Sequence, residues 1–316
     1  MPVTPGINKT LGGAVIAACL TVLVPSAAHA ALPADVTLPD TGVTVRESSA
    51  DPLTVSSYTL GNLAYLRRGE AFAKQKGYQE ITVAPGGTKA LAVPSSYSSG
   101  HDSVLLADLV SEKAVKIQTV QKPFVAHFAH WSRDGRKVVL TVQRKAAGGW
   151  TTTGFVIVDV AAKTARTVTV SGVDPAATFR WTPDNAQLVA AHQGGVRFYG
   201  QDGTARRTLA KTGAPGGGED VFSPSGKGLM TWCPASYAED VCVWDRGSGK
   251  IAVKVKGVKP KALLGWWDER SFVAVLPGSG VYKVVVVDVK GKGLRVLADV
   301  SARDWNRKIY LSYTRS

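Results

Sequence analysis

The amino-acid sequence predicts an all-β fold, a six-bladed β-propeller built from four-stranded blades. Three observations lead to this prediction. A motif of aromatic residue, tight turn and apolar strand recurs along the chain at a spacing typical of one propeller blade. Runs of β-branched residues that end near an aspartate follow the copies. Segments at the two ends of the chain can together supply a sixth blade, which would close the ring and leave no free sheet edge.

The composition is that of an ordinary globular protein. Of the 316 residues, 45% are hydrophobic and 20% are charged, which excludes a disordered chain. The 33 glycines and 16 prolines follow no three-residue period, so they exclude collagen and indicate many turns. No apolar run beyond the N-terminus approaches twenty residues, and we therefore expect no transmembrane span in the mature chain.

The N-terminus has the pattern of a signal peptide. Lys9 precedes an apolar stretch from Leu11 to Val24, and Ala28-His-Ala30 resembles a cleavage site. The sequence therefore predicts an exported protein. The expected organisation is a signal peptide at 1–30, a short linker at 31–40 and a single propeller domain at 41–316.

Cys19 leaves a second form of export open. Ile16-Ala-Ala-Cys19 resembles a lipobox, which would leave a lipidated Cys19 at the membrane surface. The apolar run continues after Cys19, where a mature lipoprotein would normally turn polar. The pattern therefore favours simple secretion over a lipid anchor.

The two remaining cysteines predict a disulfide. Cys233 and Cys242 flank a short loop between two expected strands, and exported proteins commonly oxidise such a pair. The bond would staple a hairpin and stabilise it by about 3 kcal/mol. No histidine or further cysteine lies at ligand spacing, so we expect no metal here.

The repeats fix the blade boundaries. The best copy runs from Trp131 through Ser-Arg-Asp-Gly135 into an apolar strand. The anchor residues of successive copies are 41 to 50 residues apart, and they are Val83, Trp131, Trp181, Phe222 and Trp266. This period is that of propeller blades.

The turns within the repeats have a structural interpretation. Asp134 and Asp184 can accept hydrogen bonds from their own backbone, and Gly135 and Gly226 suit the left-handed conformation that closes such a turn. In four of the predicted blades the third strand ends near an aspartate, at Asp108, Asp159, Asp245 and Asp288. These carboxylates could act together as one functional set, but an aspartate that recurs at the same position of each repeat more often opens a turn.

The chain ends complete the predicted ring. Asp304 to Tyr313 looks like one more first hairpin, and the stretch from Thr41 to Phe72 can supply the missing strands. A blade built from both ends would leave no exposed edge.

The turns Trp131-Ser-Arg-Asp-Gly135 and Trp181-Thr-Pro-Asp-Asn185 resemble the WD40-like repeats of TolB-type propellers, over about Gln79 to Tyr313. The resemblance implies an exported propeller of a family that commonly binds other proteins. The family's namesake carries an additional N-terminal α/β domain. About fifty residues separate Ala31 from the first repeat, too few for that domain.

Three local patterns suggest catalysis or metal binding, and each has a simpler explanation. On a strand, His127 and His130 would point to opposite sides, which argues against a shared metal. Ser99-Gly-His-Asp102 contains the residue types of a hydrolase triad, but adjacent residues cannot normally align them. Gly247-Ser-Gly-Lys250 lacks the remainder of a phosphate loop and fits a turn between strands. We therefore assign no catalytic or metal-binding residue.

Charge and aromatic residues suggest classes of partner. The formal net charge of +14 favours anionic envelope polymers, although solubility alone can explain it. Nucleic acid is a poor candidate because no recognised module is present. Trp150, Trp266 and Trp267 could stack on sugars, whereas the periodic Trp131 and Trp181 are expected to pack between blades.

The sequence favours a secreted, monomeric, non-enzymatic propeller that binds a protein or an anionic envelope component and needs no cofactor. It leaves open an alternative, a lactonase-like, metal-dependent hydrolase with its site in the central channel. That alternative requires acidic groups that converge in the channel, and the sequence does not place any there.

Overall fold

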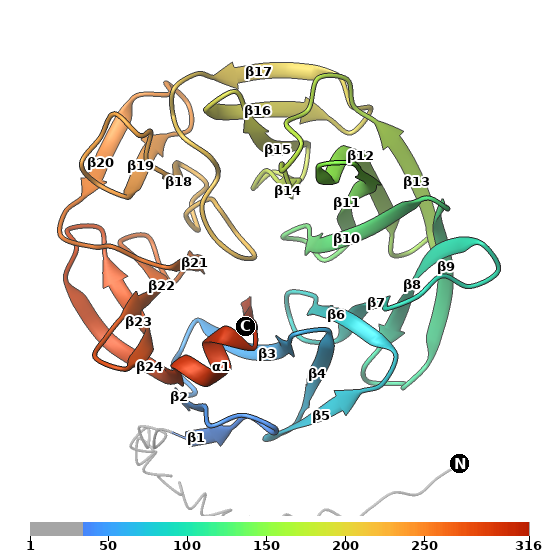
Figure 1. Ribbon diagram of the computed structural model, residues 1–316, viewed down its shortest axis with the longest axis horizontal. Coiled ribbons are helices and arrows are strands. Elements are labelled where there is room, and N and C mark those ends of the chain that lie inside the picture. Colours follow the sequence, from blue (N-terminus) through green and yellow to red (C-terminus); the bar gives the residue numbers. More distant parts are fainter. Residues whose placement is uncertain (1–33, 316) are drawn as a thin grey trace, which may run out of the picture. The chain divides into compact units, whose positions relative to one another are not determined.

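The computed structural model describes residues 34–315, which form a ring of six β-sheets around a central axis (Figure 1). Each sheet is one blade, with its innermost strand beside the axis and its outermost strand at the rim. The predicted all-β, six-bladed propeller is confirmed. The expected signal peptide at 1–30 and the alternative lipidation site at Cys19 lie outside the described residues.

Three consecutive blades consist of four antiparallel strands in chain order from the axis outward. Blade 2 contains β6 (Tyr78–Val83), β7 (Lys89–Pro94), β8 (His101–Asp108) and β9 (Ala114–Gln121). Blade 3 contains β10 (Phe124–Trp131), β11 (Lys137–Ala146), β12 (Gly149–Asp159) and β13 (Thr164–Thr169). Blade 4 contains β14 (Arg180–Trp181), β15 (Gln187–His192), β16 (Gly195–Gly200) and β17 (Ala205–Leu209).

The middle strands of the blades are buried on both faces, because each blade packs between two others. In β11, Val138, Val139 and Leu140 are all fully buried although they alternate between the two faces. This explains why the strands read as continuous β-branched runs rather than as an alternation of apolar and polar residues.

Blade 1 combines the C-terminal strand with three strands from the N-terminal region. Its innermost strand is β25 (Ile309–Arg315), which pairs antiparallel with β3 (Leu53–Leu60). The blade continues outward with β4 (Leu63–Arg68) and β5 (Ala71–Gln75). The predicted closure of the ring by N- and C-terminal strands is therefore confirmed.

Two details of the predicted closure are wrong. The expected hairpin at Asp304 is instead a short helix, α1 (Ala302–Asn306), followed by a single strand. The Ser301 hydroxyl accepts from the Asp304 backbone N–H (3.0 Å) and donates to its carboxylate, a local arrangement that favours a helix start.

The second detail is the segment around Val43 to Val45, which joins blade 6 instead of blade 1. Blade 6 contains β21 (Ala262–Trp266), β22 (Ser271–Pro277), β23 (Val281–Asp288) and β24 (Gly293–Ser301). At its rim, β2 (Thr44–Glu47) pairs with β24 and carries β1 (Ala34–Thr37), which lies within the stretch expected to be a linker. β4 and β5 already occupy the outer positions of blade 1.

Blade 5 lacks a regular innermost strand. Its sheet contains β18 (Gly228–Trp232), β19 (Val241–Asp245) and β20 (Ile251–Val255). The segment between β17 and β18 runs into the interior of the ring (Figure 1) and includes three consecutive glycines, 216–218. A Cβ on Gly218 would lie 2.6 Å from the Leu264 carbonyl oxygen, so only glycine permits this close approach to blade 6.

The repeated turns follow each innermost strand. Gly135, Asn185 and Gly226 have φ angles of 66°, 57° and 75°, in the left-handed region. The carboxylate of Asp134 accepts hydrogen bonds from the Arg136 backbone N–H and from the Ser132 hydroxyl. Asp184 makes the equivalent bonds with Ala186 and Thr182 in blade 4.

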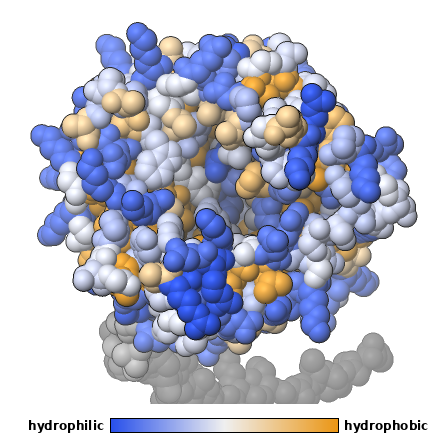
Figure 2. Space-filling view, in the orientation of Figure 1, coloured by the Kyte–Doolittle hydropathy of each residue, from blue (hydrophilic) through white to orange (hydrophobic). Residues whose placement is uncertain are grey.

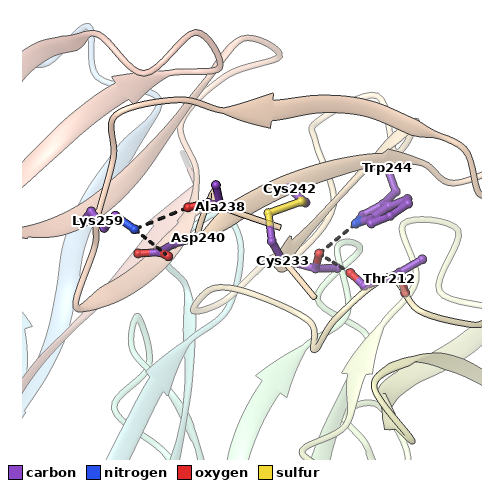
Figure 3. The surroundings of a disulfide bond; sticks show 8 residues. Thr212, Cys233, Ala238, Asp240, Cys242, Trp244 and Lys259 are labelled. Atoms are coloured by element: carbon purple, nitrogen blue, oxygen red, sulfur yellow. Dashed lines mark hydrogen bonds and ion pairs between the residues drawn. A yellow bond between two sulfur atoms is a disulfide. The ribbon is translucent and has the colours of Figure 1, made fainter. Parts of the chain in front are cut away.

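The predicted disulfide between Cys233 and Cys242 is present in the hairpin of β18 and β19 (Figure 3). Beside it, the indole N–H of Trp244 donates to the Thr231 hydroxyl (2.9 Å). At the other end of the loop, the Lys259 ammonium lies 3.5 Å from the Asp240 carboxylate. The disulfide and the Trp244–Thr231 hydrogen bond thus hold this hairpin together, and the Lys259–Asp240 ion pair links its loop to the segment after β20.

Within residues 34–315, the structure contains no helix with the length and apolar character needed to cross a membrane.

Candidate functional site: the central channel

A pocket of about 310 Å³ opens among the C-terminal ends of the innermost strands. We call this side of the ring the turn face, because the turns that follow the innermost strands lie there. The pocket is lined by Leu53, Val83, Pro85, Trp131, Arg133, Glu219, Asp220, Pro224, Leu264, Gly265, Trp266, Tyr313, Thr314 and Arg315. Figure 2 shows one face of the molecule, on which polar side chains surround a hollow near the ring axis.

The walls of the pocket are mainly apolar. Leu53, Val83, Leu264 and Tyr313 contribute aliphatic and aromatic surface from blades 1, 2 and 6. Each of these side chains is at least nine-tenths buried, so the surface that they present is fixed by core packing.

Arg133 ties the turn of blade 3 to blade 5 across the pocket. Its Nε donates to the Asp220 carboxylate (2.7 Å), and its terminal nitrogens donate to the carbonyl oxygens of Pro224 (2.7 Å), Ser223 (2.7 Å) and Phe222 (3.1 Å). Burial raises the pKa of Asp220, and the neighbouring Arg133 guanidinium acts in the opposite direction. Most donors of Arg133 are therefore used within the protein.

Arg315, the other cation of the pocket, makes fewer hydrogen bonds with the protein than Arg133 does. It donates to the carbonyl oxygen of Trp266 (3.0 Å) and, more weakly, to that of Trp267 (3.5 Å). Burial lowers its pKa, whereas the nearby Asp220 carboxylate raises it. The remaining guanidinium donors of Arg315 are available to a ligand.

Five polar side chains from five blades converge in the channel, and all but Glu219 lie outside the lining of this pocket. We call them the channel cluster, and they are Glu80, His130, Arg180, Glu219 and Tyr310. Glu80, His130 and Arg180 precede the ends of their innermost strands by three, one and one residues, so alternation along a strand places these three side chains on equivalent faces.

Glu80 is held by a bulge in the neighbouring blade. The backbone N–H groups of Phe128 and Ala129 donate to its two carboxylate oxygens, at 2.9 Å and 2.6 Å. These donors are free because the pairing of β10 with β11 shifts between His127 and His130, and Phe128 has a φ of 55°. Burial nevertheless raises the pKa of Glu80 to about 7.

His130 lies in the channel with an unsatisfied ring nitrogen. Its side chain is buried, and its Nδ1 forms no hydrogen bond, although a Glu219 carboxylate oxygen lies 3.5 Å away. Burial lowers the pKa of His130. A buried imidazole nitrogen without a partner is costly and commonly has a function.

Arg180 supplies the positive charge of the cluster. Its Nε donates to the Gly218 carbonyl oxygen (3.1 Å), and another nitrogen donates to the Thr178 hydroxyl. Within residues 34–315 it forms no ion pair, although the Glu219 carboxylate is close enough to act on its pKa. Desolvation lowers its pKa.

The channel cluster does not form a metal site of the usual kind. Within the described part of the chain, no three His, Cys, Asp or Glu side chains lie close enough together to hold an ion. Glu80 and Glu219 do approach each other in the channel, which the sequence did not predict. The lactonase-like alternative remains a prediction.

The other residues considered from the sequence occupy structural positions. His127 lies against Trp150 and the Gln79 side chain and is not a member of the channel cluster. Asp102 accepts hydrogen bonds from the backbone of Ser103 and Ala126, and this bonding fixes β10 rather than activating a nucleophile.

The four aspartates at the ends of third strands all open turns. Each accepts at least one backbone N–H two to four residues further along the chain, and they are Asp108, Asp159, Asp245 and Asp288. The segment Gly247–Lys250 forms the turn between β19 and β20. Neither set faces the channel pocket.

Sequence reasoning missed Glu80, Arg180 and Glu219. The repeat alignment contained a usable signal, because each precedes a predicted anchor by one or three residues. The signal identifies a shared strand face but not which blades oppose one another across the axis.

No family profile matches the chain, and no curated protein is similar to it in sequence. Solved structures do share its fold. TolB from Acinetobacter baumannii is 14% identical with a TM-score of 0.50, over 85% of this chain and 67% of that one. The β-propeller domain of the Trilobed protease from Pyrococcus furiosus is 13% identical with a TM-score of 0.52, over 82% and 83% of the two chains.

An oligogalacturonate lyase in complex with manganese is 12% identical with a TM-score of 0.53, over 84% of each chain. At these identities the similarities establish the propeller fold alone. The same fold thus occurs in a TolB protein, a protease domain and a lyase, and function must be argued from the site.

Proposed function

We propose that this chain is an exported, non-catalytic binding propeller that receives a segment of a partner protein in the pocket at the turn face. The observation that carries the proposal is the pocket itself, with apolar walls and a charged network at one end. Fully packed apolar walls around a small concave site are typical of an anchor point for a partner's side chain.

The size of the pocket supports a short segment rather than a large cofactor. About 310 Å³ lies at the lower end of the range for small-molecule sites. The Arg133–Asp220 pair is already fixed by three carbonyl contacts, so little side-chain order is lost when a ligand binds beside it. Such preorganisation favours affinity for a complementary apolar group.

An anionic polymer is the less favoured partner for this pocket. The net charge of +14 would attract such a polymer to the surface in general. Inside the pocket, however, protein acceptors take most donors of Arg133, and two carboxyl groups, those of Asp220 and Glu219, form part of the lining. Among the charged residues that line the pocket, only Arg315 keeps several hydrogen-bond donors available to a polyanion.

The proposal places the protein outside the cytoplasm. The Cys233–Cys242 disulfide is compatible with an oxidising compartment. Alkylation of the secreted protein followed by intact-mass analysis tests this point, and we expect neither thiol to react until a reductant is added. Labelling of both thiols without reductant would contradict export to an oxidising compartment.

A photo-crosslinker placed at Pro85 tests the binding site. Pro85 lines the pocket, whereas Pro183 occupies the same turn position in blade 4 and does not, so it is the matched control. With p-benzoylphenylalanine at each site in producing cells, we expect a defined protein adduct at 85 that is absent at 183. Competition by unlabelled wild-type protein, but not by a Pro85→Trp variant, should remove the adduct.

Three outcomes would contradict the proposal. Equal adducts at both positions would indicate non-specific contact. Loss of all binding at moderate salt, with no crosslink at 85, would favour an anionic surface ligand. A stoichiometric calcium ion that resists dialysis would favour the metal-dependent enzyme.

A further inference from the structure

We propose that the channel cluster is a second site, which binds a single uncharged sugar ring from the face opposite the turn face. The site uses the polar groups of the channel together with exposed aromatic side chains at the rim. Of its five members, only Glu219 also lines the turn-face pocket, and the other four are set back from that pocket along the innermost strands.

The first argument is that several polar groups of the channel cluster have unused hydrogen-bonding capacity. His130 is 7% exposed and its Nδ1 has no partner. Tyr310 is 39% exposed, and its hydroxyl makes no hydrogen bond with the described residues. Arg180 uses two of its nitrogens for protein acceptors and retains further donors.

The second argument is the mixture of donors and acceptors. Arg180 can only donate, the Glu219 carboxylate can only accept when ionised, and His130 and Tyr310 can do either. A cationic ligand would be repelled by Arg180, and an anionic ligand by Glu219 and ionised Glu80. Hydroxyl groups avoid both penalties because each one donates and accepts, so a neutral polyhydroxylated ring suits the site.

The third argument is the aromatic rim beside the cluster. Phe128 and Trp150 are 45% and 49% exposed, and His127 lies between them with ring centroids 5.6 Å and 5.9 Å away. Large exposed rings offer flat apolar surface to the C–H faces of a sugar, while their polar neighbours bind its hydroxyl groups.

The rim and the cluster are physically connected at one residue. Phe128 has a φ of 55°, which is rare for a bulky residue, and its backbone N–H donates to the Glu80 carboxylate (2.9 Å). The same strained position therefore exposes the ring and orients an acceptor of the channel. Local strain of this kind concentrates at binding sites.

Calorimetric titration of the full chain tests the proposal with three probes: methyl glucoside, N-acetylglucosamine and glucuronic acid. We expect at least one neutral sugar to bind with one-to-one stoichiometry. Glucuronic acid should bind more weakly than the neutral sugars, because its carboxylate meets Glu219 and Glu80. No binding of either neutral sugar would overturn the proposal, and preferential binding of the acid would overturn the electrostatic argument.

Substitutions locate the site. Glu219→Gln and Tyr310→Phe each remove one polar function with little change of shape, and each should weaken sugar binding about tenfold. Glu70→Gln, on the exposed turn between β4 and β5, is the matched control and should leave binding unchanged. Thermal melts of the variants establish that they are folded.

Two further results would contradict the assignment of the sugar to the channel or the separation of its site from the turn-face pocket. If Trp150→Ala abolishes binding while both cluster variants bind normally, the sugar lies on the surface and the channel assignment is wrong. The Pro85→Trp variant should keep its sugar affinity even if it loses the protein partner. Loss of sugar binding in that variant would show that the two sites are one.

Discussion

The indole N–H of Trp181 donates to the backbone carbonyl oxygen of His130 at 3.1 Å, from one blade to the preceding one. Trp266 donates to the Val221 carbonyl oxygen in the same way, and Trp131 donates to the Thr82 hydroxyl; in each case the acceptor is the residue before the preceding anchor. The repeated tryptophan is therefore a link between adjacent blades as well as a core side chain. In blade 4 it also fixes the backbone of His130, whose ring faces the channel cluster.

Trp181→Phe should destabilise the protein by about 1 to 3 kcal/mol, because a buried carbonyl oxygen loses its donor and some volume is lost. Chemical denaturation measures the change. Trp150→Phe, at an exposed position, is the control and should have little effect. Equal losses of stability in the two variants would show that the hydrogen bond of the Trp181 indole between blades does not stabilise the fold.

Gly135→Val should destabilise by about 1 to 3 kcal/mol, since the turn of blade 3 requires a φ of 66° there. Gly148 has no comparable requirement, and a Cβ built on it meets no atom within 4 Å. Thermal and urea unfolding of Gly135→Val and Gly148→Val should therefore differ clearly. Similar curves for the two variants would argue against the register of the repeat.

Removal of residues 309–315 should cause aggregation or a large loss of cooperative unfolding, because β3 would lose its partner and blade 1 would open to solvent. Light scattering and calorimetry measure both effects. A truncated protein with an unchanged melting curve would mean that the ring does not depend on this pairing.

Glu80 should make stability depend on pH. Its pKa rises from 4.5 in the reference state to about 7 in the folded protein, so the folded state holds the proton over a range in which the unfolded chain has released it. Its contribution to the free energy of unfolding therefore falls as the pH rises from about 4.5 to 7. We expect a total loss of about 1 to 3 kcal/mol.

Glu80→Gln removes this titration while retaining an acceptor for one backbone N–H. Urea unfolding at several pH values should give the variant a flatter profile than the wild type across that window, with the largest gain in relative stability at neutral pH. A profile that runs parallel to the wild type would show that Glu80 does not titrate there.

The architecture could be predicted because its signals are local. Proline, aspartate and glycine at fixed turn positions, with an aromatic residue before them, report one hairpin at a time, and their period gives the blade. The ring then follows from the need to pair the two chain ends. The disulfide could be predicted for the same reason, because Cys233 and Cys242 lie close together in the sequence.

The channel cluster depends on which blades oppose each other and on irregularities within single strands. The bulge at Phe128, which supplies the donors to Glu80, leaves no plain mark in the hydrophobic pattern. The glycines at 216–218 bring blade 5 close enough to place Glu219 beside His130, a contact set by two separate blades. Such placements emerge only when the blades are assembled.

The pairing of β25 with β3 also determines the order of folding. The Ser56 hydroxyl meets the Ser312 carbonyl oxygen across a sequence separation of 256 residues, so blade 1 cannot form until almost the whole domain has been synthesised. Pairing over such a distance has a high entropic cost and is slow compared with the hairpins of single blades. Until it forms, β3 is an unprotected strand edge, and the nascent chain is most vulnerable to misassociation in that interval.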